Sequence, residues 1–304
     1  MTSPPHLNAA WSPKADVPQA SAPTPADQRA GDWWRTGIIE MRPGEIRYRG
    51  YAVQDLIERQ VGLASMVWLL TRGELPTEAQ ARLLESALMA AVDHGPQAPS
   101  IAIARMAATC GVGLNGAIAS AVNVLGDVHG GAGEQALTLY ADVAERLDAG
   151  VALPVAVDEA LQAWTSAYGK TIPGFGHRFH PVDPRTAPLL ALVDVAQAAG
   201  EVPGRHAAIA RAIEAALAAR KGRPIPMNID GVTAVIYGEL GFPAALARGF
   251  FCLSRSVGAL AHAWEQMTQG GRIKGPMPKD WLPTYEGPPA RELPPPQGAA
   301  TPGS

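Results

Sequence analysis

The sequence is poor in cysteine, in aromatic residues and in charge of either sign. Of its 304 residues, 2 are cysteine, 6% are aromatic and 17% are charged, and the formal net charge is −3. Cys110 and Cys252 lie in separate apolar stretches without a Cys-x-x-Cys pairing, which argues against a disulfide scaffold and predicts a reducing, cytoplasmic location. The balanced charge predicts no general attraction to nucleic acid or to an anionic membrane, and leaves room for a locally basic phosphate pocket.

Long apolar runs are missing as well. No segment reaches the roughly 18 uninterrupted apolar residues of a membrane-spanning helix, and the N-terminus has no apolar signal-peptide core. Residues 1–30 are rich in Pro, Ala and Ser, residues 286–304 are rich in Pro, and both stretches predict disordered tails. The body between them is long enough for one large domain or two closely integrated ones.

Helical periodicity runs through almost all of that body. Between residues 83 and 92 the apolar side chains recur on one helix face. Thr77 and Gln80 predict a capping box at the start of this helix, and Gly95 with Pro96 predicts its end just after His94. Similar helices are predicted at 51–72, 100–111, 114–127, 134–147, 155–168, 186–199, 203–220, 231–240 and 243–269. The one convincing strand, Glu45 to Tyr48, is too little for a sheet core, so the predicted fold class is all-α.

Three glycine-rich breaks interrupt the helices, and each holds a histidine or an aspartate. They span Gly126 to Glu134, Pro173 to Arg178, and Pro226 to Gly231. Glycine lets a backbone approach a ligand closely, and a histidine flanked by glycines is poorly placed as core filler. The breaks therefore mark His129, His177 and Asp230 as candidate functional residues.

Each of these residues also has a structural interpretation when it is taken singly. His129 is compatible with a histidine bonded to a carbonyl group, and Asp230 with a helix N-cap. His177 with His180 is compatible with half of a metal site. Against that site, the surrounding proline and glycine argue against a continuous helix, and no Cys or carboxylate cluster completes a zinc set. No metal is predicted.

In combination and in order, the motifs resemble the citrate synthase superfamily. The resemblance is carried by Glu45 to Tyr51, Gly73 to Thr77, Asp93 to Gly95, His129 to Ala132, Gly174 to Arg178, Asp183 to Arg185, Asn228 to Asp230, Arg255 to Gly258 and Ala261-His262. It covers nearly the whole predicted body, and Gly-Phe-Gly-His-Arg with the following Asp-Pro-Arg is its most specific part. The resemblance implies a citrate synthase-like helical fold with the active site in the cleft between two domains.

The same resemblance implies the boundaries and the assembly. The large helical domain takes residues 31–133 and 228–285, and the small helical domain takes residues 134–227. A hinge between them closes over the substrate and excludes water. The family's two-fold dimer makes a homodimer the expected assembly.

The family joins acetyl-CoA to oxaloacetate, and the resemblance implies roles for the matching positions. Asp230 is the base that removes a proton from the thioester methyl group. His129 is the neutral donor that holds the resulting enolate oxygen. His177 is the general acid that protonates the ketone oxygen of the second reactant.

Substrate-binding positions follow from the same resemblance. Arg185, Arg255 and His94 are expected to hold the dicarboxylate, because bidentate arginine suits carboxylates. Gly174, Phe175 and Gly176 are the expected contact for CoA. No cofactor is expected to remain bound, since CoA enters as the thioester of a substrate, acetyl-CoA or citryl-CoA.

Two departures from the family narrow the function. Only Glu78 to Val92 lies where ordinary citrate synthases carry a long helical segment, and this short form resembles citryl-CoA lyases, including the lyase module of ATP-citrate lyase. Gly275 stands where a citrate synthase places an arginine that reaches the partner subunit's active site; Arg272 or Lys274 is a candidate replacement. His129, in contrast, is a synthase-like feature.

The favoured function is therefore a citryl-CoA lyase-type enzyme that interconverts citryl-CoA with acetyl-CoA and oxaloacetate. The first alternative is a citrate synthase, which also hydrolyses the thioester, or a related 2-alkylcitrate or malyl-type synthase. The second alternative is a non-catalytic CoA-binding protein on the same scaffold.

Overall fold

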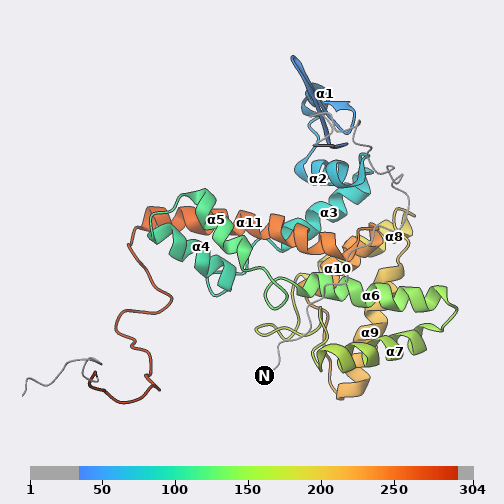
Figure 1. Ribbon diagram of the computed structural model, residues 1–304. Coiled ribbons are helices and arrows are strands. Elements are labelled where there is room, and N and C mark those ends of the chain that lie inside the picture. The colour runs from blue at the N-terminus through green and yellow to red at the C-terminus, as the bar shows by residue number, and fades with distance from the viewer. Residues whose placement is uncertain (1–33, 294–304) are drawn as a thin grey trace, which may run out of the picture.

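The computed structural model describes residues 34–293, which form eleven helices and one small sheet (Figure 1). The predicted tail at residues 1–30 lies outside the described residues, as do residues 294–304 of the second predicted tail. Residues 286–293 are exposed and contain no helix or strand. None of the described helices is both long and apolar enough to cross a membrane. The all-α fold class is confirmed.

A three-stranded antiparallel sheet begins the described chain. It consists of β1 (Ile39–Arg42), β2 (Glu45–Tyr48) and β3 (Tyr51–Ala52), in that order. The predicted strand is β2, whereas the predicted helix at 51–72 is wrong in its first half. There the chain forms β3, then α1 (Val53–Glu58), and only then α2 (Leu63–Arg72). The break follows from Gln60, whose positive φ of 54° cannot continue a right-handed helix.

Helix α3 (Glu78–Ala90) has the predicted capping box and a different end. Thr77 Oγ1 accepts from Gln80 N at 3.2 Å, and Gln80 Oε1 accepts from Thr77 N at 2.9 Å. The helix stops at Ala90, before the predicted end at His94. The Asp93 carboxylate accepts from Gly95 N at 3.1 Å, a local bond that competes with helix continuation. His94 therefore lies in a loop, free to face a cavity.

The other predicted helices are confirmed within a few residues, except that α5 ends four residues early. They are α4 (Pro99–Thr109), α5 (Leu114–Asn123), α6 (Ala132–Asp148), α7 (Leu153–Tyr168), α8 (Thr186–Ala198), α9 (Arg205–Lys221), α10 (Ile229–Glu239) and α11 (Ala244–Gln269). The early end of α5 releases residues 124–131 as the loop that carries His129.

Two hydrophobic clusters hold these helices together. The first, here called the main core, surrounds α10 and includes large side chains such as Trp68, Tyr140 and Phe250. The second, here called the alanine layer, joins α4, α5 and α11; it consists of Ala98, Ile101, Ala104, Ala117, Ala121, Ala259 and Ala263. Helix α11 runs through both regions (Figure 1). The main core draws residues from both predicted domains, and the domain division remains a prediction.

Candidate active site

One cavity of about 430 Å³ is lined by all six residues predicted to act in catalysis or to bind the dicarboxylate. They are His94, His129, His177, Arg185, Asp230 and Arg255. They come from three loops, from the residue before α8, from the first turn of α10 and from the middle of α11. The structure thus brings together side chains that are up to 161 positions apart in the sequence, from His94 to Arg255.

The loop before His177 lies directly against the segment that leads into α10. Asn228 N donates to Gly174 O at 2.9 Å, and Gly176 N donates to Pro226 O at 2.7 Å. A Cβ on Gly174 would lie 2.7 Å from the Gly231 Cα, and the φ of Gly174 is +82°. This close approach requires glycine and brings the loop of His177 against the start of the helix that carries Asp230.

The same packing gives the predicted CoA contacts a structural role. Gly174, Phe175 and Gly176 are not among the residues that line the cavity. Phe175 is buried, with its ring 6.4 Å from that of Tyr140. The glycines signalled a close approach of two backbone segments, and their contact with CoA remains a prediction.

Asp230 lies in the first turn of α10 and does not cap that helix. The cap is Asn228, whose Oδ1 accepts from Asp230 N at 3.0 Å and from Gly231 N at 3.2 Å. No hydrogen bond to the Asp230 carboxylate is found within residues 34–293, so the group is available to a substrate. Burial raises the pKa of Asp230, while the charges of Arg185 and Arg255 oppose that shift. The raised pKa makes this carboxylate a stronger base than an ordinary aspartate.

His129 is held by Ser100 in the first turn of α4. Its Nε2 lies 3.2 Å from Ser100 N and 3.1 Å from Ser100 Oγ. Since a backbone N–H only donates, Nε2 accepts, and the proton of the neutral ring sits on Nδ1. Burial, and secondly the charge of Arg255, lower the pKa of His129. The imidazole therefore stays neutral with one N–H to donate.

His177 is held in the opposite tautomer. Its Nδ1 accepts from the backbone N–H groups of Phe179 and His180, each at 3.0 Å, so its proton sits on Nε2. Burial lowers the pKa of His177, and Asp183 opposes that shift. The two backbone donors also stabilise the charge left on the ring when Nε2 gives up its proton, which makes the Nε2–H a better acid.

Three histidines meet beside this loop in a grouping that the sequence did not reveal. The ring of His177 lies 5.5 Å from that of His94 and 4.6 Å from that of His180. One ring nitrogen from each lies within 4.8 Å of the others, close enough to hold a metal ion. His94 was the missing third group, more than 80 positions away in the sequence.

The tautomer of His177 argues against a metal at this cluster. A metal binds through the lone pair of a ring nitrogen. In His177, Nε2 has a lone pair to offer only if the ring proton moves from Nε2 to Nδ1. At Nδ1 that proton would face the two backbone N–H groups of Phe179 and His180. The hydrogen bonds favour a proton donor over a metal ligand at His177.

Arg185 is fixed by the buried carboxylate of Asp183. Its Nε and Nη2 lie 2.9 Å and 2.8 Å from the two oxygens of Asp183, which also accepts from Ile229 N at 3.0 Å. Burial acts to raise the pKa of Asp183, but these hydrogen bonds and the charge of Arg185 lower it to about 2. Asp183 therefore ties Arg185 to the start of α10.

Arg255 supplies the second guanidinium from inside the protein. It is buried, its Nη1 lies 3.4 Å from Ser100 Oγ, and its Cζ lies 4.8 Å from the centre of the Phe251 ring. Ser100 thus contacts both Arg255 and His129. Ser100 could not be identified from the sequence, because a serine in the first turn of a helix is ordinary and only the fold places it beside His129.

The residues named as replacements for an arginine at Gly275 lie apart from this cavity. Arg272 and Lys274 follow α11 in a segment without helix or strand, and neither lines the cavity. Lys274 N donates to Thr109 Oγ1 at 3.0 Å, which fixes the segment against the end of α4. Their predicted role in a partner's site remains a prediction.

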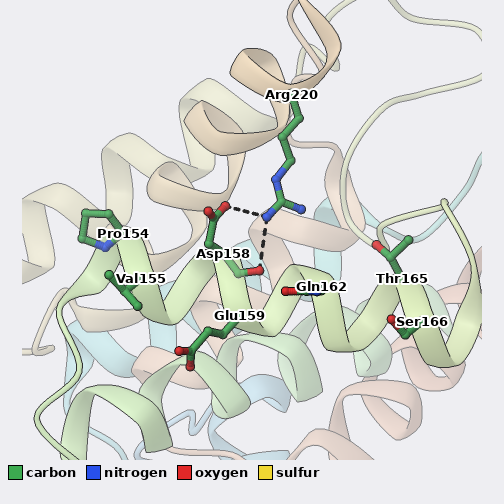
Figure 2. A pocket seen from close by; sticks show the side chains of 8 residues that line it. All are labelled: Pro154, Val155, Asp158, Glu159, Gln162, Thr165, Ser166 and Arg220. Atoms are coloured by element: carbon green, nitrogen blue, oxygen red, sulfur yellow. Dashed lines mark hydrogen bonds and ion pairs between the residues drawn. The ribbon is translucent and has the colours of Figure 1, made fainter.

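A second hollow of about 660 Å³ lies along α7 and is a poorer candidate. Figure 2 shows Arg220 of α9 reaching to Asp158 of α7, whose Oδ1 it contacts at 2.5 Å. Glu159 is likewise paired, with Arg146 at 2.8 Å. The lining of this hollow contains no histidine, and its arginine already has a carboxylate partner. The active-site assignment therefore rests on the first cavity.

The comparisons with known proteins agree with this geometry. The family model for the citrate synthase C-terminal domain matches residues 29–88 and 76–276. A citrate synthase of Haloferax volcanii is 32% identical over 214 residues, which are 69% of this chain and 53% of that protein. A probable ATP-citrate synthase of Caenorhabditis elegans is 27% identical, and the match covers 82% of this chain and 24% of that protein.

A solved structure matches over nearly its whole length. The citryl-CoA lyase from Hydrogenobacter thermophilus is 34% identical with a TM-score of 0.76, and the match covers 86% of this chain and 98% of that one. By contrast, the chain spans about half the length of the curated citrate synthases that it matches. The fold, the cavity and the matched residues lead to one conclusion: the chain belongs to the citrate synthase family.

Proposed function

We propose that this protein is a citryl-CoA lyase-type enzyme, which interconverts citryl-CoA with acetyl-CoA and oxaloacetate. The observation that carries the proposal is the cavity that collects Asp230, His129 and His177 together with two guanidinium groups. Claisen-type chemistry needs a base, an enolate-stabilising donor and an acid at the second carbonyl, and the cavity offers one group of each kind.

In the condensing direction Asp230 removes a proton from the methyl carbon of acetyl-CoA. The electron pair moves to the thioester oxygen, which the Nδ1–H of His129 holds. The enolate carbon then attacks the ketone carbon of oxaloacetate, and the ketone oxygen takes the Nε2 proton of His177. Asp230 has gained one proton and His177 has lost one, so citryl-CoA forms without a change in the number of protons that the enzyme carries.

Cleavage reverses these steps. His177 takes the proton of the citryl hydroxyl group, the carbon–carbon bond breaks, and Asp230 returns its proton to the enolate carbon. The pKa of Asp230, raised by burial, favours the protonated acid that this last step requires.

The two arginines are proposed to hold the carboxylates of oxaloacetate and of the citryl group. Arg185 is oriented by Asp183, and Arg255 is buried beside Ser100. Planar guanidinium groups suit this task because each can bind a carboxylate through two parallel hydrogen bonds. The pKa of His94 is lowered by burial and secondly by the charge of Arg185. Its neutral imidazole is proposed to add a hydrogen bond to the same substrate, since it lines the cavity with the two arginines.

A lyase is favoured over a synthase by the fraction of each relative's length that this chain matches. The citryl-CoA lyase of Hydrogenobacter thermophilus is matched over 98% of its length, whereas the citrate synthase of Haloferax volcanii is matched over 53%. Citrate synthase is the second candidate, because His129 in the glycine-rich loop is a synthase-like feature. Its Nε2 accepts from Ser100 N, which leaves the Nδ1–H to donate to an enolate oxygen. A related 2-alkylcitrate or malyl-type product fits the same acid–base groups.

A homodimer is part of the proposal. Leu253, Val257, Leu260, Trp264 and Met267 are all at least 42% exposed. They recur at intervals of three and four residues and so form one apolar stripe on α11. An apolar stripe of this length in water favours a second copy of the chain as its cover. Sedimentation of the wild type and of Trp264→Ser, which removes the largest member, should show a dimer that weakens in the variant.

Product analysis with citryl-CoA tests the proposed activity. A lyase yields acetyl-CoA and oxaloacetate in equal amounts, without free CoA. A citrate synthase yields citrate and CoA, which a thiol reagent detects, and it also releases thiol from acetyl-CoA with oxaloacetate. Thiol release in both assays would contradict the proposed lyase activity and favour a citrate synthase. The absence of any product would favour a non-catalytic CoA-binding protein.

A further inference from the structure

Arg248 of α11 joins the two ends of the loop that carries His129. Its Nη2 lies 2.6 Å from Asp127 Oδ1, and its Nε forms an ion pair with Glu134. Asp127 lies in the loop before His129, and Glu134 lies in the first turn of α6, which follows the loop. One guanidinium group therefore holds a carboxylate on each side of the histidine that is proposed to stabilise the enolate.

The loop is packed tightly against its own backbone and against α11. A Cβ on Gly131 would lie 2.8 Å from the Cα of Asp127, and a Cβ on Gly130 would lie 3.1 Å from Cε1 of the Phe251 ring. Glycine is required at both positions because the backbone segments approach so closely. With so little free space around the loop, a movement of Asp127 must displace the backbone of His129, two residues on.

The charges show what Arg248 contributes to this packing. The carboxylates of Asp127 and Glu134 both lie within ion-pair distance of the same guanidinium group. Without that group two like charges would face each other and repel, which would open the loop. His129 Nε2 would then lose Ser100 N and Ser100 Oγ, now 3.2 Å and 3.1 Å away. The Nδ1–H of His129 would no longer have a fixed direction.

Arg248 lies beside the cavity and does not line it. Neither Arg248 nor its partners Asp127 and Glu134 are among the lining residues. Arg248 precedes Arg255 by seven residues on α11, which is close to two helical turns, so both side chains leave the helix on the same face. Arg255 reaches the cavity directly, whereas Arg248 reaches the loop at its side. An effect of Arg248 on the reaction must therefore pass through the loop.

We propose that Arg248 is a positioning residue for His129. By pairing with Asp127 and Glu134 it keeps the loop closed and the imidazole bonded to Ser100. The task of His129 as the enolate donor is taken from the proposed function, and in that respect this inference rests on it. The hydrogen bonds to Ser100 do not depend on that function, so the position of the ring can be tested without turnover.

Nitrogen NMR of the imidazole rings tests the positioning without a substrate. Well above the ordinary histidine pKa of about 6.5, the wild type should show His129 with its proton on Nδ1, because Ser100 N donates to Nε2. In Arg248→Gln these signals should move toward the averaged shifts of a histidine in water. Arg248→Lys keeps the charge and should retain more of the wild-type shifts. Asp127→Asn breaks the pair from the loop side and should move the same signals; His129→Gln identifies them.

Turnover of citryl-CoA gives the second readout. Arg248→Gln should lower kcat about 10- to 100-fold, because a misplacement of about 1 Å in a catalytic group can cost about 100-fold. KM should change less than kcat, since His129 acts on charge that develops in the transition state. In a His129→Ala background, Arg248→Gln should change kcat less than about twofold, because the group through which it acts is absent.

Arg146→Gln is the matched control. Arg146 also pairs with two carboxylates, Asp142 and Glu159, and its side chain is 29% exposed against 27% for Arg248. It joins α6 to α7 and is not among the residues that line the cavity. Arg146→Gln should lower the free energy of unfolding about as much as Arg248→Gln, and it should leave kcat and the ring signals of His129 unchanged.

Three results would overturn the proposal. They are unchanged His129 signals in Arg248→Gln, moved signals with an unchanged kcat in an active enzyme, and a loss of kcat that persists in full in the His129→Ala background. The two readouts also separate this proposal from the proposed function. If the wild type cleaves no citryl-CoA while the His129 signals move in Arg248→Gln, the positioning stands and the lyase activity fails. If the wild type cleaves citryl-CoA and the signals stay in place, the lyase activity stands and the positioning fails.

Discussion

The main core and the alanine layer differ in the size of their side chains. The cavity lies at the boundary between them, since it is lined by Ile229 of the main core and by Ala98 of the alanine layer. The main core contains aromatic and branched side chains, whereas the alanine layer contains one isoleucine among alanines. Large side chains bury more apolar area and so stabilise the fold more strongly. Alanine buries little area, but it lets helices approach closely. The main core should therefore set stability, and the alanine layer should set the geometry of the active site.

The two regions contribute different parts of the cavity. The helix of the main core, α10, carries Asp230 in its first turn and is tied to Asp183. Two helices that the alanine layer joins carry other groups of the cavity: Ser100 at the start of α4 and Arg255 in the middle of α11. Substitutions on the two sides of this boundary should therefore separate effects on the free energy of unfolding from effects on the turnover number.

The largest loss of stability is expected from Asp183→Asn, on the main-core side. The change removes the charge partner of Arg185 and weakens the bond to Ile229 N. Breaking a buried ion pair in this way costs about 3–5 kcal/mol, measurable by urea denaturation. Asp194→Asn is the control, since its pair with Arg211 is exposed and should contribute no more than about 1 kcal/mol. Equal losses in the two variants would contradict the anchoring role.

The stabilising effect of Asp183 also has a predicted dependence on pH. Its folded-state pKa of about 2 lies below the ordinary value of 3.8. The stabilisation is therefore fully present above pH 3.8 and is lost as the pH falls toward 2. The difference in unfolding free energy between the wild type and Asp183→Asn should shrink across that window.

The same truncation in each hydrophobic cluster sharpens the comparison. Ile209 in the main core and Ile101 in the alanine layer are both fully buried. Ile→Ala at either position should cost about 2–5 kcal/mol of unfolding free energy. Only Ile101→Ala should also lower the turnover number, because Ile101 follows Ser100 on the helix that positions His129. A turnover reduced equally in the two variants would remove the distinction between the clusters.

A smaller effect is expected from Ser100→Ala. The backbone N–H of residue 100 still reaches His129 Nε2, so the tautomer and the fold should be kept. The hydroxyl that contacts both His129 and Arg255 is lost. One hydrogen bond contributes about 0.5–1.5 kcal/mol, which corresponds to a turnover reduced roughly two- to tenfold. Ser120→Ala is the control, because the Ser120 hydroxyl donates to Gly116 O at 2.8 Å within α5, away from the cavity lining.

The smallest effect is a shift in the acid limb of the pH–rate profile. Burial lowers the pKa values of His94, His129 and His177 from 6.5. The neutral forms therefore persist as the pH falls below 6.5, and activity is lost only as it passes through the lowered values. A profile of kcat against pH should therefore keep more than half of its maximal activity at 6.5, with the midpoint of the acid limb below that pH. Half-maximal activity at or above 6.5 would contradict neutral donors.

The helices could be predicted from the sequence because alanine content and apolar periodicity are local signals. The capping box at Thr77 is equally local, and it was confirmed. The break near Gln60 was missed, because a non-glycine residue with positive φ leaves no mark in the composition. The end of α3 was placed late for a similar reason, since the side-chain bond from Asp93 competes with the helix.

The site could be predicted in part, because three of its groups stand in unusual glycine-rich settings. Those settings pointed to His129, His177 and Asp230, and the resemblance added Arg185, Arg255 and His94. Non-local contacts could not be predicted. Ser100 reaches His129, and His94 joins His177 and His180, only because helices distant in sequence pack together. The packing of Gly174 and Gly176 against residues 226–231 is also non-local and could not be predicted, while their contact with CoA remains a prediction.

The central claim is that Asp230 moves the proton at the carbon that joins the two halves of citryl-CoA. The most direct test compares the rate of citryl-CoA cleavage by the wild type with that by Asp230→Asn, after denaturation has shown that both are folded. Asparagine keeps the shape and loses the proton, so the rate should fall by about 100- to 10,000-fold. A rate within a fewfold of the wild type would contradict the account.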